Sequence, residues 1–228
     1  MEEKQSANRL YGRKKLYKLS DEKTTLLDDV LPKFIINIDN NNENLSNFSQ
    51  KKEIFLEIGF GYGEHLAFQA YNNPNIDIIG AEPFLNGITN LLKIIVKKNI
   101  KNIKIYNHDA LTLIKSIKPE TISTIYILFP DPWPKTRHNK RRIINESSIK
   151  EYSRILKKDG KIIIATDSKD YQYWILLHMQ KNRLFEWLVN DANDWRTRLI
   201  KGPLTKYEKK SIKSNNKPVY FMFKKNII

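Results

Sequence analysis

A glycine-rich turn directly after the first strongly apolar segment is the clearest candidate in this chain for binding a ligand. It reads Glu57-Ile58-Gly59-Phe60-Gly61-Tyr62-Gly63, so three glycines alternate with other residues and an acid stands two positions ahead of the first. Glycines permit backbone angles that other residues avoid, and they let a ligand approach the main chain where a Cβ would block it. The turn alone predicts a cofactor site of the nucleoside type.

The spacing of these glycines indicates which cofactor the turn would take. A dinucleotide fingerprint is G-x-G-x-x-G, but Glu64 occupies the position of its third glycine here. An acid in the first turn of the next helix would repel a pyrophosphate, whereas S-adenosylmethionine has no phosphate and carries an ammonium and a sulfonium group. The spacing therefore favours S-adenosylmethionine and disfavours a nicotinamide oxidoreductase.

Two further acids follow the next two expected strands. Glu82 follows Gly80-Ala81, about twenty residues past the turn, where ribose hydroxyls are usually bound. Asp109 follows Asn107-His108, where a short acid can accept a hydrogen bond from the adenine amino group. Taken singly, each feature has a structural alternative, a tight turn for the glycines and a helix cap for Asp109. Their order and spacing together favour a cofactor site.

A proline-rich loop carries the second candidate chemistry. Pro130-Asp131-Pro132-Trp133-Pro134-Lys135 leads into the basic run Thr136-Arg137-His138-Asn139-Lys140-Arg141-Arg142. The three prolines stop the backbone from continuing a strand or a helix, so Asp131 is held at a strand end. Trp133 offers a face on which a base could stack, and the basic run can follow phosphates. The structural alternative, a packed tryptophan beside a solvated charge run, leaves the position of Asp131 unexplained.

Short β-branched runs alternate with longer amphipathic segments, and these elements would position the candidate groups. The expected strands cover residues 54–58, 76–81, 103–106, 122–129 and 161–166, with two more over 185–189 and 218–224. Helices are expected over 64–72, 84–98, 143–157 and 169–182. Near-continuous apolar strands separated by helices indicate a buried parallel sheet with ligands beyond the carboxyl ends of its strands.

This pattern predicts an α/β fold with one doubly wound, mostly parallel sheet of seven strands. The sheet would be Rossmann-like, with an antiparallel C-terminal strand that helps to close one edge. Residues 1–20 have few apolar groups and are expected to form a basic flexible arm. Residues 21–228 are expected to form a single domain, with an asparagine-rich linker over 37–50.

The composition indicates which class of protein this is and which kind of partner it suits. The 228 residues fit one domain, and no apolar run approaches the roughly 20 residues of a membrane span. The polar start shows no secretory signal, there is no cysteine, and the four histidines lack metal-ligand spacing. We therefore expect a soluble cytoplasmic protein without a metal. The net charge of +15 suits a polyanionic partner, although a lysine- and asparagine-rich composition can raise the charge by itself.

Five motifs together resemble the bacterial tRNA (guanine-N7-)-methyltransferase family. They are the glycine turn, Gly80-Ala81-Glu82, Phe129-Pro130-Asp131-Pro132-Trp133-Pro134-Lys135 with its basic continuation, Ala165-Thr166-Asp167, and Thr205-Lys206-Tyr207-Glu208. The match runs from the basic arm at Arg9 to the end of the chain, and the proline-tryptophan loop and the Thr-x-Tyr-Glu segment are its specific parts. Where the family usually has a glycine this chain has Asn215, and we expect the turn to survive because asparagine tolerates positive φ.

The resemblance implies an enzyme that uses S-adenosylmethionine, without a metal, to methylate N7 of the variable-loop guanosine in tRNA. It implies that the cofactor is held by Glu57, Gly59, Gly61, Gly63, Glu82, Asp109 and Asp131. The target nucleotide would be contacted by Lys135, Asp167, Thr205, Lys206, Tyr207 and Glu208. The rest of the tRNA would be contacted by Arg9, Arg13, Arg137, His138, Asn139, Lys140, Arg141 and Arg142. No obligate protein partner is expected, and the protein is expected to be a monomer or a homodimer.

Guanine N7 has a free lone pair and no proton, so methylation there needs no general base. We hypothesise that Asp131 and Asp167 are the catalytic acids, sharing base recognition and stabilisation of the charge that passes to the ring, while Glu208 completes the pocket. A methyltransferase with an amino target is the nearest alternative, but its motif typically places an aromatic residue directly after two prolines. An RNA-binding protein on a degenerate fold would explain the charge but not the intact acids.

Overall fold

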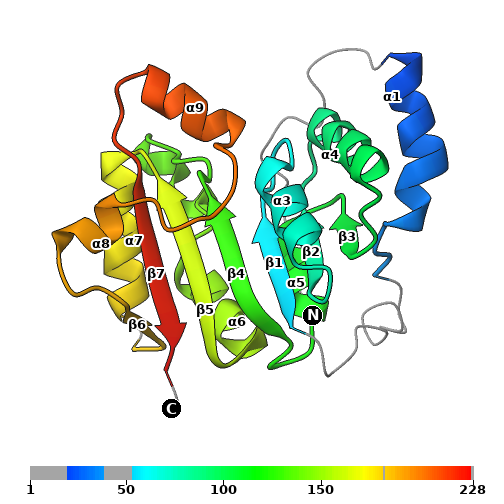
Figure 1. Ribbon diagram of the computed structural model, residues 1–228. Coiled ribbons are helices and arrows are strands. Elements are labelled where there is room, and N and C mark those ends of the chain that lie inside the picture. The colour runs from blue at the N-terminus through cyan, green and yellow to red at the C-terminus, as the bar shows by residue number, and fades with distance from the viewer. Residues whose placement is uncertain (1–19, 39–52, 182, 227–228) are drawn as a thin grey trace, which may run out of the picture.

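The computed structural model describes residues 20–38, 53–181 and 183–226, which form a sheet with helices on both of its faces (Figure 1). The basic arm predicted over residues 1–20, with Arg9 and Arg13, lies outside the described residues except for Ser20. Most of the linker predicted over 37–50 also lies outside them. The predictions for these two segments therefore stay predictions.

Seven strands form the sheet in the order β3-β2-β1-β4-β5-β7-β6. The five strands from β3 to β5 are parallel, and β7 is antiparallel to both of its neighbours. The bounds are β1 Ile54–Ile58, β2 Asp77–Ala81, β3 Ile103–Tyr106, β4 Ile122–Leu128, β5 Leu156–Thr166, β6 Phe185–Trp187 and β7 Val219–Lys225. This confirms the predicted seven-stranded sheet and its antiparallel C-terminal strand. The pair of β6 and β7 closes one edge, with β6 outermost.

One strand begins earlier than the sequence predicts. β5 starts at Leu156, which pairs with Ile122, whereas the prediction starts it at residue 161. The polar residues 157–160 lie between two paired stretches, and Asp159 among them has a φ of 59°. Because this segment is polar and irregular, a search for apolar runs does not detect that the strand begins at Leu156.

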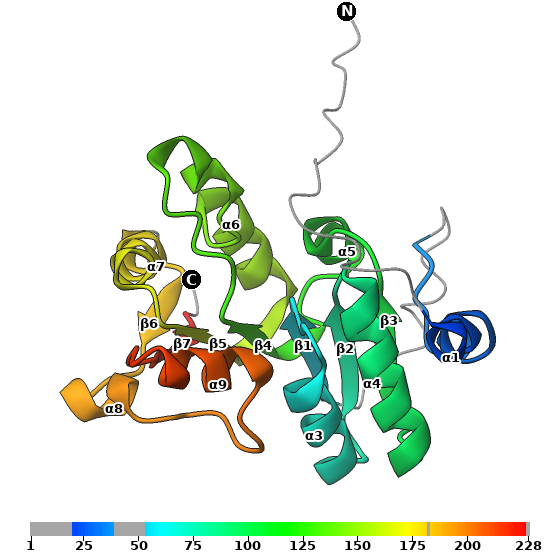
Figure 2. The same cartoon turned by 90° about the horizontal axis from the view of Figure 1, so that it is seen from above.

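Helices cover both faces of the sheet, as a doubly wound fold requires. Figure 2 shows α5, α6 and α7 on one face and α3, α4, α8 and α9 on the other. The bounds are α1 Asp21–Thr25, α3 Glu64–Asn72, α4 Leu85–Lys98, α5 Ala110–Ser116, α6 Glu146–Ile155, α7 Lys169–Lys181, α8 Ala192–Arg196 and α9 Lys206–Lys213. The four predicted helices correspond to α3, α4, α6 and α7. The others within the core domain, α5, α8 and α9, are too short to show a helical period in the sequence.

A helical lead-in covers the edge strand β3. α1 continues into a π-helical turn over Leu26–Val30 and a 3-10 turn over Leu31–Lys33. The main-chain N–H of Ile36 then donates to the carbonyl of Ile105 in β3 at 2.8 Å. The lead-in thus covers an edge that would otherwise present unpaired backbone groups.

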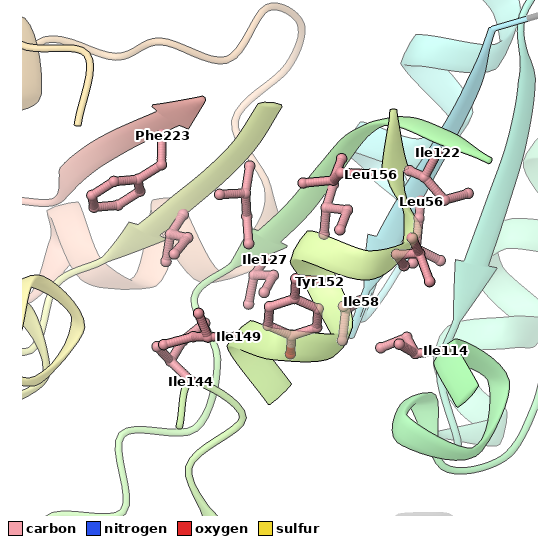
Figure 3. Packing of buried hydrophobic residues seen from close by; sticks show 14 of the residues in the cluster. Leu56, Ile58, Ile114, Ile122, Ile127, Ile144, Ile149, Tyr152, Leu156 and Phe223 are labelled. Carbon is pink, nitrogen blue, oxygen red and sulfur yellow. The ribbon is translucent and has the colours of Figure 1, made fainter. Parts of the chain in front are cut away.

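The core has one layer on each face of the sheet. Figure 3 shows the layer beneath α5 and α6, where Leu56, Ile58 and Ile127 from the central strands surround Tyr152 of α6. The other layer joins α3 and α4 to β2 and β3. Because both faces are covered, the central strands are apolar along most of their length, which is the pattern that predicts a buried parallel sheet.

Arg154 ties the ends of α5 and α6 together at the edge of the sheet where β4 and β5 begin. Its guanidinium donates to the carbonyls of Ile117 at 2.7 Å and Ile114 at 2.8 Å. It also pairs with Glu151 of its own helix at 2.7 Å. A basic side chain in this position satisfies carbonyls that the end of a helix leaves without a partner.

Replacing Leu56 by alanine is expected to lower the free energy of unfolding by about 2–5 kcal/mol, because Leu56 has no exposed surface and the remaining cavity would not collapse fully. Val96 on α4 is 58% exposed, so Val96→Ala should change stability by less than about 0.5 kcal/mol. Urea unfolding followed by circular dichroism measures both values. Equal losses in the two variants would contradict this assignment of the core.

Candidate active site

A cavity of about 850 Å³ opens at the carboxyl ends of β1, β2 and β4 and beside the end of β3. It lies where the order of strands reverses, since β2 and β4 flank β1 on opposite sides. Doubly wound sheets bind their ligands at this switch point. Among the residues predicted to hold the cofactor, those that line the cavity are Gly59, Gly61, Glu82, Asp109 and Asp131.

The glycine turn lets other groups approach its main chain closely. Gly59, Gly61 and Gly63 have φ angles of 71°, 55° and 77°, in the left-handed region that favours glycine. The N–H of Gly61 donates to the Glu82 carboxylate at 2.8 Å. Its carbonyl lies so close to α4 that a Cβ at Gly87 would come within 1.9 Å of it. The Gly61 peptide is therefore fixed from two sides.

Two residues predicted to hold the cofactor, Gly63 and Glu57, lie behind the turn and not at the cavity wall. A Cβ at Gly63 would approach Leu91 to 2.8 Å, so this glycine allows α3 and α4 to pack closely. Glu57 is 3% exposed, and its carboxylate lies 2.8 Å from Nδ1 of the buried His65. In this structure both residues support the turn from inside the protein.

A chain of hydrogen bonds fixes where His65 carries its proton. Asn73 donates to the amide oxygen of Gln69 at 3.3 Å, which turns the amide nitrogen of Gln69 toward Nε2 of His65 at 3.0 Å. The amide donates there, so His65 has its proton on Nδ1 and donates it to Glu57. Nothing in the spacing of the sequence identifies His65 as part of this network.

Glu82 is a buried carboxylate in the wall of the cavity. Its two oxygens accept from the main-chain N–H groups of Gly61 at 2.8 Å and Phe84 at 3.0 Å. Burial raises the pKa of Glu82 to about 7, the carboxylates of Asp131 and Glu57 add to the shift, and the two N–H groups oppose it. Glu82 therefore changes charge near neutral pH.

Asp109 caps a helix and also lines the cavity, which are the two alternatives that the sequence leaves open. One of its oxygens accepts from the N–H of Thr112 at 3.0 Å and from the hydroxyl of the same residue at 3.1 Å. Asp109 thereby caps the start of α5. The residue also lines the cavity, so capping and ligand binding are compatible.

The proline-rich loop holds Asp131 at the cavity. The N–H of Phe129 donates to the carbonyl of Ala165 at 2.8 Å, which extends the pairing of β4 with β5 up to the loop. Phe129 and Trp133 have φ angles of 54° and 45°, a conformation that is strained for residues with side chains. Asp131 keeps contact with solvent, and partial burial of its carboxyl raises its pKa.

The basic run forms a 3-10 helix over Thr136–Arg141 beside the cavity. Lys135 and the first six residues of the run have exposed or partly exposed side chains; those six are Thr136, Arg137, His138, Asn139, Lys140 and Arg141. Desolvation lowers the pKa of His138, and the surrounding cations, Arg141 foremost, lower it further. The run therefore presents a concentrated positive charge at the rim of the cavity.

Arg142 differs from the rest of the run. It is 2% exposed, and its Nε donates to the carbonyl of Pro132 at 2.9 Å. Its guanidinium also pairs with Asp170 of α7. Arg142 is nevertheless among the residues that line the cavity, beside Lys140 and Arg141. The expectation that it contacts RNA stays a prediction.

Glu208 anchors α9 and does not line the cavity. The N–H of Glu208 donates to Thr205 Oγ1 at 3.1 Å, and its carboxylate accepts from the N–H of Thr205 at 2.8 Å. Glu208 has no exposed surface and accepts from Arg198 and from the hydroxyl of Tyr220, both at 2.8 Å. Burial raises the pKa of Glu208, but these hydrogen bonds outweigh burial and the pKa is lowered overall. Thr205 and Glu208 therefore cap the start of α9, a role that their spacing also fits, and neither lines the cavity. Their contact with the substrate stays a prediction.

The other two residues of this segment lie against the glycine turn. Tyr207 lines the cavity, and its ring lies 2.9 Å from the place that a Cβ on Gly61 would take. The Nζ atom of Lys206 lies 3.8 Å from the centroid of the Tyr62 ring. The start of α9 therefore covers the glycine turn.

Asp167 follows the end of β5 and does not line the cavity. Its carboxylate accepts from the side-chain amide of Asn216 at 3.0 Å. Asn216 follows Asn215, whose φ of 55° confirms that asparagine can form the turn where a glycine is expected. Since β4 and β5 are neighbours, Asp131 and Asp167 follow adjacent strand ends, but only Asp131 reaches the cavity wall.

Residues 20–38, 53–181 and 183–226 contain no helix long and apolar enough to cross a membrane. The same residues contain no group of three or more His, Asp or Glu side chains that could hold a metal ion. The polar side chains that line the cavity include the carboxylates of Glu82, Asp109 and Asp131, the basic groups of the run, and His108 and Asn145.

Comparison with known proteins shows relatives along nearly the whole chain. A family model described as "Putative methyltransferase" matches residues 51–222. The tRNA (guanine-N(7)-)-methyltransferase of Agrobacterium fabrum is 36% identical over 216 residues, which cover 93% of each chain. The enzyme of the same name from Zymomonas mobilis is 36% identical over 217 residues, covering 95% of this chain and 94% of the relative.

A solved structure supports the fold independently. An antibiotic-related methyltransferase matches with a TM-score of 0.55 at 16% identity, covering 85% of this chain and 97% of that chain. A likeness at such low identity shows the fold alone, and it confirms the predicted Rossmann-like methyltransferase sheet. The sequence matches go further, and by them the chain belongs to the tRNA (guanine-N7-)-methyltransferase family.

Proposed function

We propose that this chain transfers the methyl group of S-adenosylmethionine to N7 of the variable-loop guanosine of tRNA. The observation that carries the proposal is a single cavity lined by the glycine turn and Glu82 on one side and by Asp131 and the basic run on the other. A cofactor and a base held in these two halves would meet inside it. The names of the relatives support the same reaction.

The first half of the cavity fits an adenosyl cofactor. A Cβ at Gly59 would meet nothing, so its main chain is open to a ligand. When ionised, the Glu82 carboxylate can accept hydrogen bonds from ribose hydroxyls, and Asp109 can accept from the adenine amino group. The volume of about 850 Å³ lies within the range of small-molecule sites. S-adenosylmethionine, when bound, supplies a methyl group made electrophilic by its sulfonium.

The second half would orient the guanine. N7 carries a lone pair and no proton, so the protein needs to align the ring with the methyl group and has no proton to remove. Asp131 would accept hydrogen bonds from N1 and N2 of guanine, which adenine does not offer in that arrangement. Its negative charge would also stabilise the positive charge that arises on the ring. Asp167, held by Asn216, would share this role from the next strand end.

The positive rim would bind the phosphates around the target base. Lys140 and Arg141 of the basic run and Lys210 of α9 line the cavity, and Lys206 lies against the ring of Tyr62. Contacts with phosphates fix the register of a nucleic acid without reading its sequence. Contacts from Arg9 and Arg13, a cytoplasmic location beside the tRNA pool, and a monomeric or homodimeric state stay predictions.

The purified protein is expected to form 7-methylguanosine when incubated with S-adenosylmethionine and unmodified tRNA, and mass spectrometry of the digested tRNA detects this product. A tRNA in which adenosine replaces the variable-loop guanosine should give no product. Absence of product with the unaltered tRNA would refute the proposed reaction. Product from the altered tRNA would refute the proposed target position.

Asp131→Ala and Asp167→Ala are each expected to lower kcat by at least about 100-fold, because each removes a negative charge that stabilises the positive charge arising on guanine. Both side chains keep contact with solvent, so the fold should remain intact by circular dichroism. Glu186 is an exposed acid on the edge strand β6, and Glu186→Ala should retain full activity. A fully active variant at Asp131 or Asp167 would remove that residue from the mechanism.

The affinity for S-adenosylhomocysteine is expected to rise from about pH 6 to about pH 8, because Glu82 has a pKa of about 7 and only its ionised form accepts two hydroxyl hydrogen bonds. Calorimetry across this range measures the effect. Glu82→Gln should bind about tenfold more weakly at pH 8 and should lose the pH dependence. A flat profile in the unaltered protein would show that Glu82 does not hold the ribose.

Linkage gives the opposite trend for stability without the ligand. The pKa of Glu82 in the folded protein lies above its ordinary value of 4.5, so protonation stabilises the fold. This contribution is fully present below the ordinary pKa and is lost as the pH rises through about 7. Ligand affinity and intrinsic stability should therefore change in opposite directions over the same pH range.

A further inference from the structure

The interior residue Arg142 holds the loop that carries Asp131. Its Nε donates to the carbonyl of Pro132 at 2.9 Å, and its Nη2 lies 3.4 Å from the carbonyl of Trp133. These two carbonyls belong to the residues directly after Asp131. Trp133 has a positive φ of 45°, a conformation that persists for such a residue only where its surroundings fix it. Arg142 is one of the groups that fix it.

On its other side Arg142 contacts the first turns of α7. Asp170 pairs with the guanidinium, whose carbon lies 5.1 Å from the centroid of the Tyr171 ring and 4.6 Å from that of Trp174. α7 begins two residues after Asp167. The guanidinium of Arg142 therefore contacts Pro132, which directly follows Asp131, and Asp170, which lies three positions after Asp167.

The segment after Arg142 has its own attachments to α7. The indole Nε1 of Trp174 donates to the carbonyl of Ile144 at 2.6 Å. The N–H of Ile144 donates to the hydroxyl of Tyr171 at 3.4 Å. Because these contacts do not involve the guanidinium, α7 would stay attached to the fold if Arg142 were replaced.

We propose that Arg142 is a positioning residue that fixes Asp131 and Asp167 relative to each other. The inference rests on the proposed function, which assigns both acids to one guanine. Arg142 acts through the loop main chain and α7, to which its guanidinium is bound. A guanidinium suits this role because its donors are spread over three nitrogens in a rigid plane, whereas lysine carries its three donors on a single nitrogen at the end of a flexible chain.

Arg154 provides a control for this role with the same kinds of contact, although its side chain is 29% exposed and that of Arg142 is 1% exposed. Its guanidinium also donates to two carbonyls and pairs with a carboxylate, but it does so where α5 and α6 end, away from the cavity. A variant at Arg154 therefore measures the general effect of losing such contacts. The difference between the two sites measures the effect of holding the acids.

The experiment compares Arg142→Lys with Arg154→Lys in steady-state methylation of tRNA, in S-adenosylhomocysteine binding and in thermal unfolding. Arg142→Lys is expected to lower kcat by about 100-fold, as a misplacement of about 1 Å does. The KM for tRNA and the affinity for S-adenosylhomocysteine should change by less than about threefold, since the glycine turn and the exposed basic run keep their geometry. Arg154→Lys should lower the melting temperature but keep kcat within about twofold.

Hydrogen exchange and chemical rescue give readouts that a merely structural role would not produce. Arg142→Lys should speed exchange of the amides over residues 133–141, and Arg154→Lys should not. Added guanidinium ions should raise the kcat of Arg142→Ala by at least about tenfold, whereas ammonium ions at equal ionic strength should not. If Arg142→Ala does not fold, Asp170→Asn provides the second variant, because it removes the carboxylate that pairs with Arg142. It is expected to lower kcat by about tenfold.

Unchanged kcat and unchanged loop exchange in Arg142→Lys would overturn the proposal, as would an equal loss of kcat in Arg154→Lys. Failure of the proposed function is separate, because in that case the unaltered protein forms no 7-methylguanosine. The exchange measurement needs no turnover, so it tests whether Arg142 holds the loop in either event.

Discussion

The parallel pairing of β1, β2, β4 and β5 is the constraint on which the rest of the site depends. Because these strands run in the same direction, the turn after each one emerges at the same edge of the sheet. Groups far apart in the sequence, such as Gly61, Glu82 and Asp131, meet there as a result. A slip of one strand by one residue would exchange the side chains that pack on the two faces of the sheet and would carry its terminal acid away from the cavity.

The sequence predicts the sheet well because its strands are buried on both faces, and it predicts the cavity because glycines and acids follow strand ends. It does not predict roles that depend on where a long side chain points. Arg142 and Glu208 stand in charge-rich segments, where charged side chains usually face solvent. Their partners, Pro132 and Arg198, come from other segments. Only the folded chain shows that both residues are buried.

Buried polar contacts hold the segments that apolar packing leaves undetermined. Glu57 with His65 supports the glycine turn, Glu208 with Arg198 fixes the start of α9, and Arg142 supports the proline-rich loop. Removing a charge from water is unfavourable, so each of these groups requires several partners in fixed positions. These requirements make the three segments rigid around a cavity whose ligands need accurate alignment.

The place of β7 between β5 and β6 determines when these strands can pair during synthesis. β6 precedes β7 in the sequence, yet β7 lies between β5 and β6 (Figure 1). On the ribosome, β5 keeps an unpaired edge until residues 219–225 have emerged, and β6 has no strand beside it until then. α9, which brings Tyr207 to the cavity, leaves the ribosome only shortly before. A nascent chain therefore lacks the strand beside β5 and the part of the cavity wall at Tyr207 until the segment from α9 to β7 has emerged.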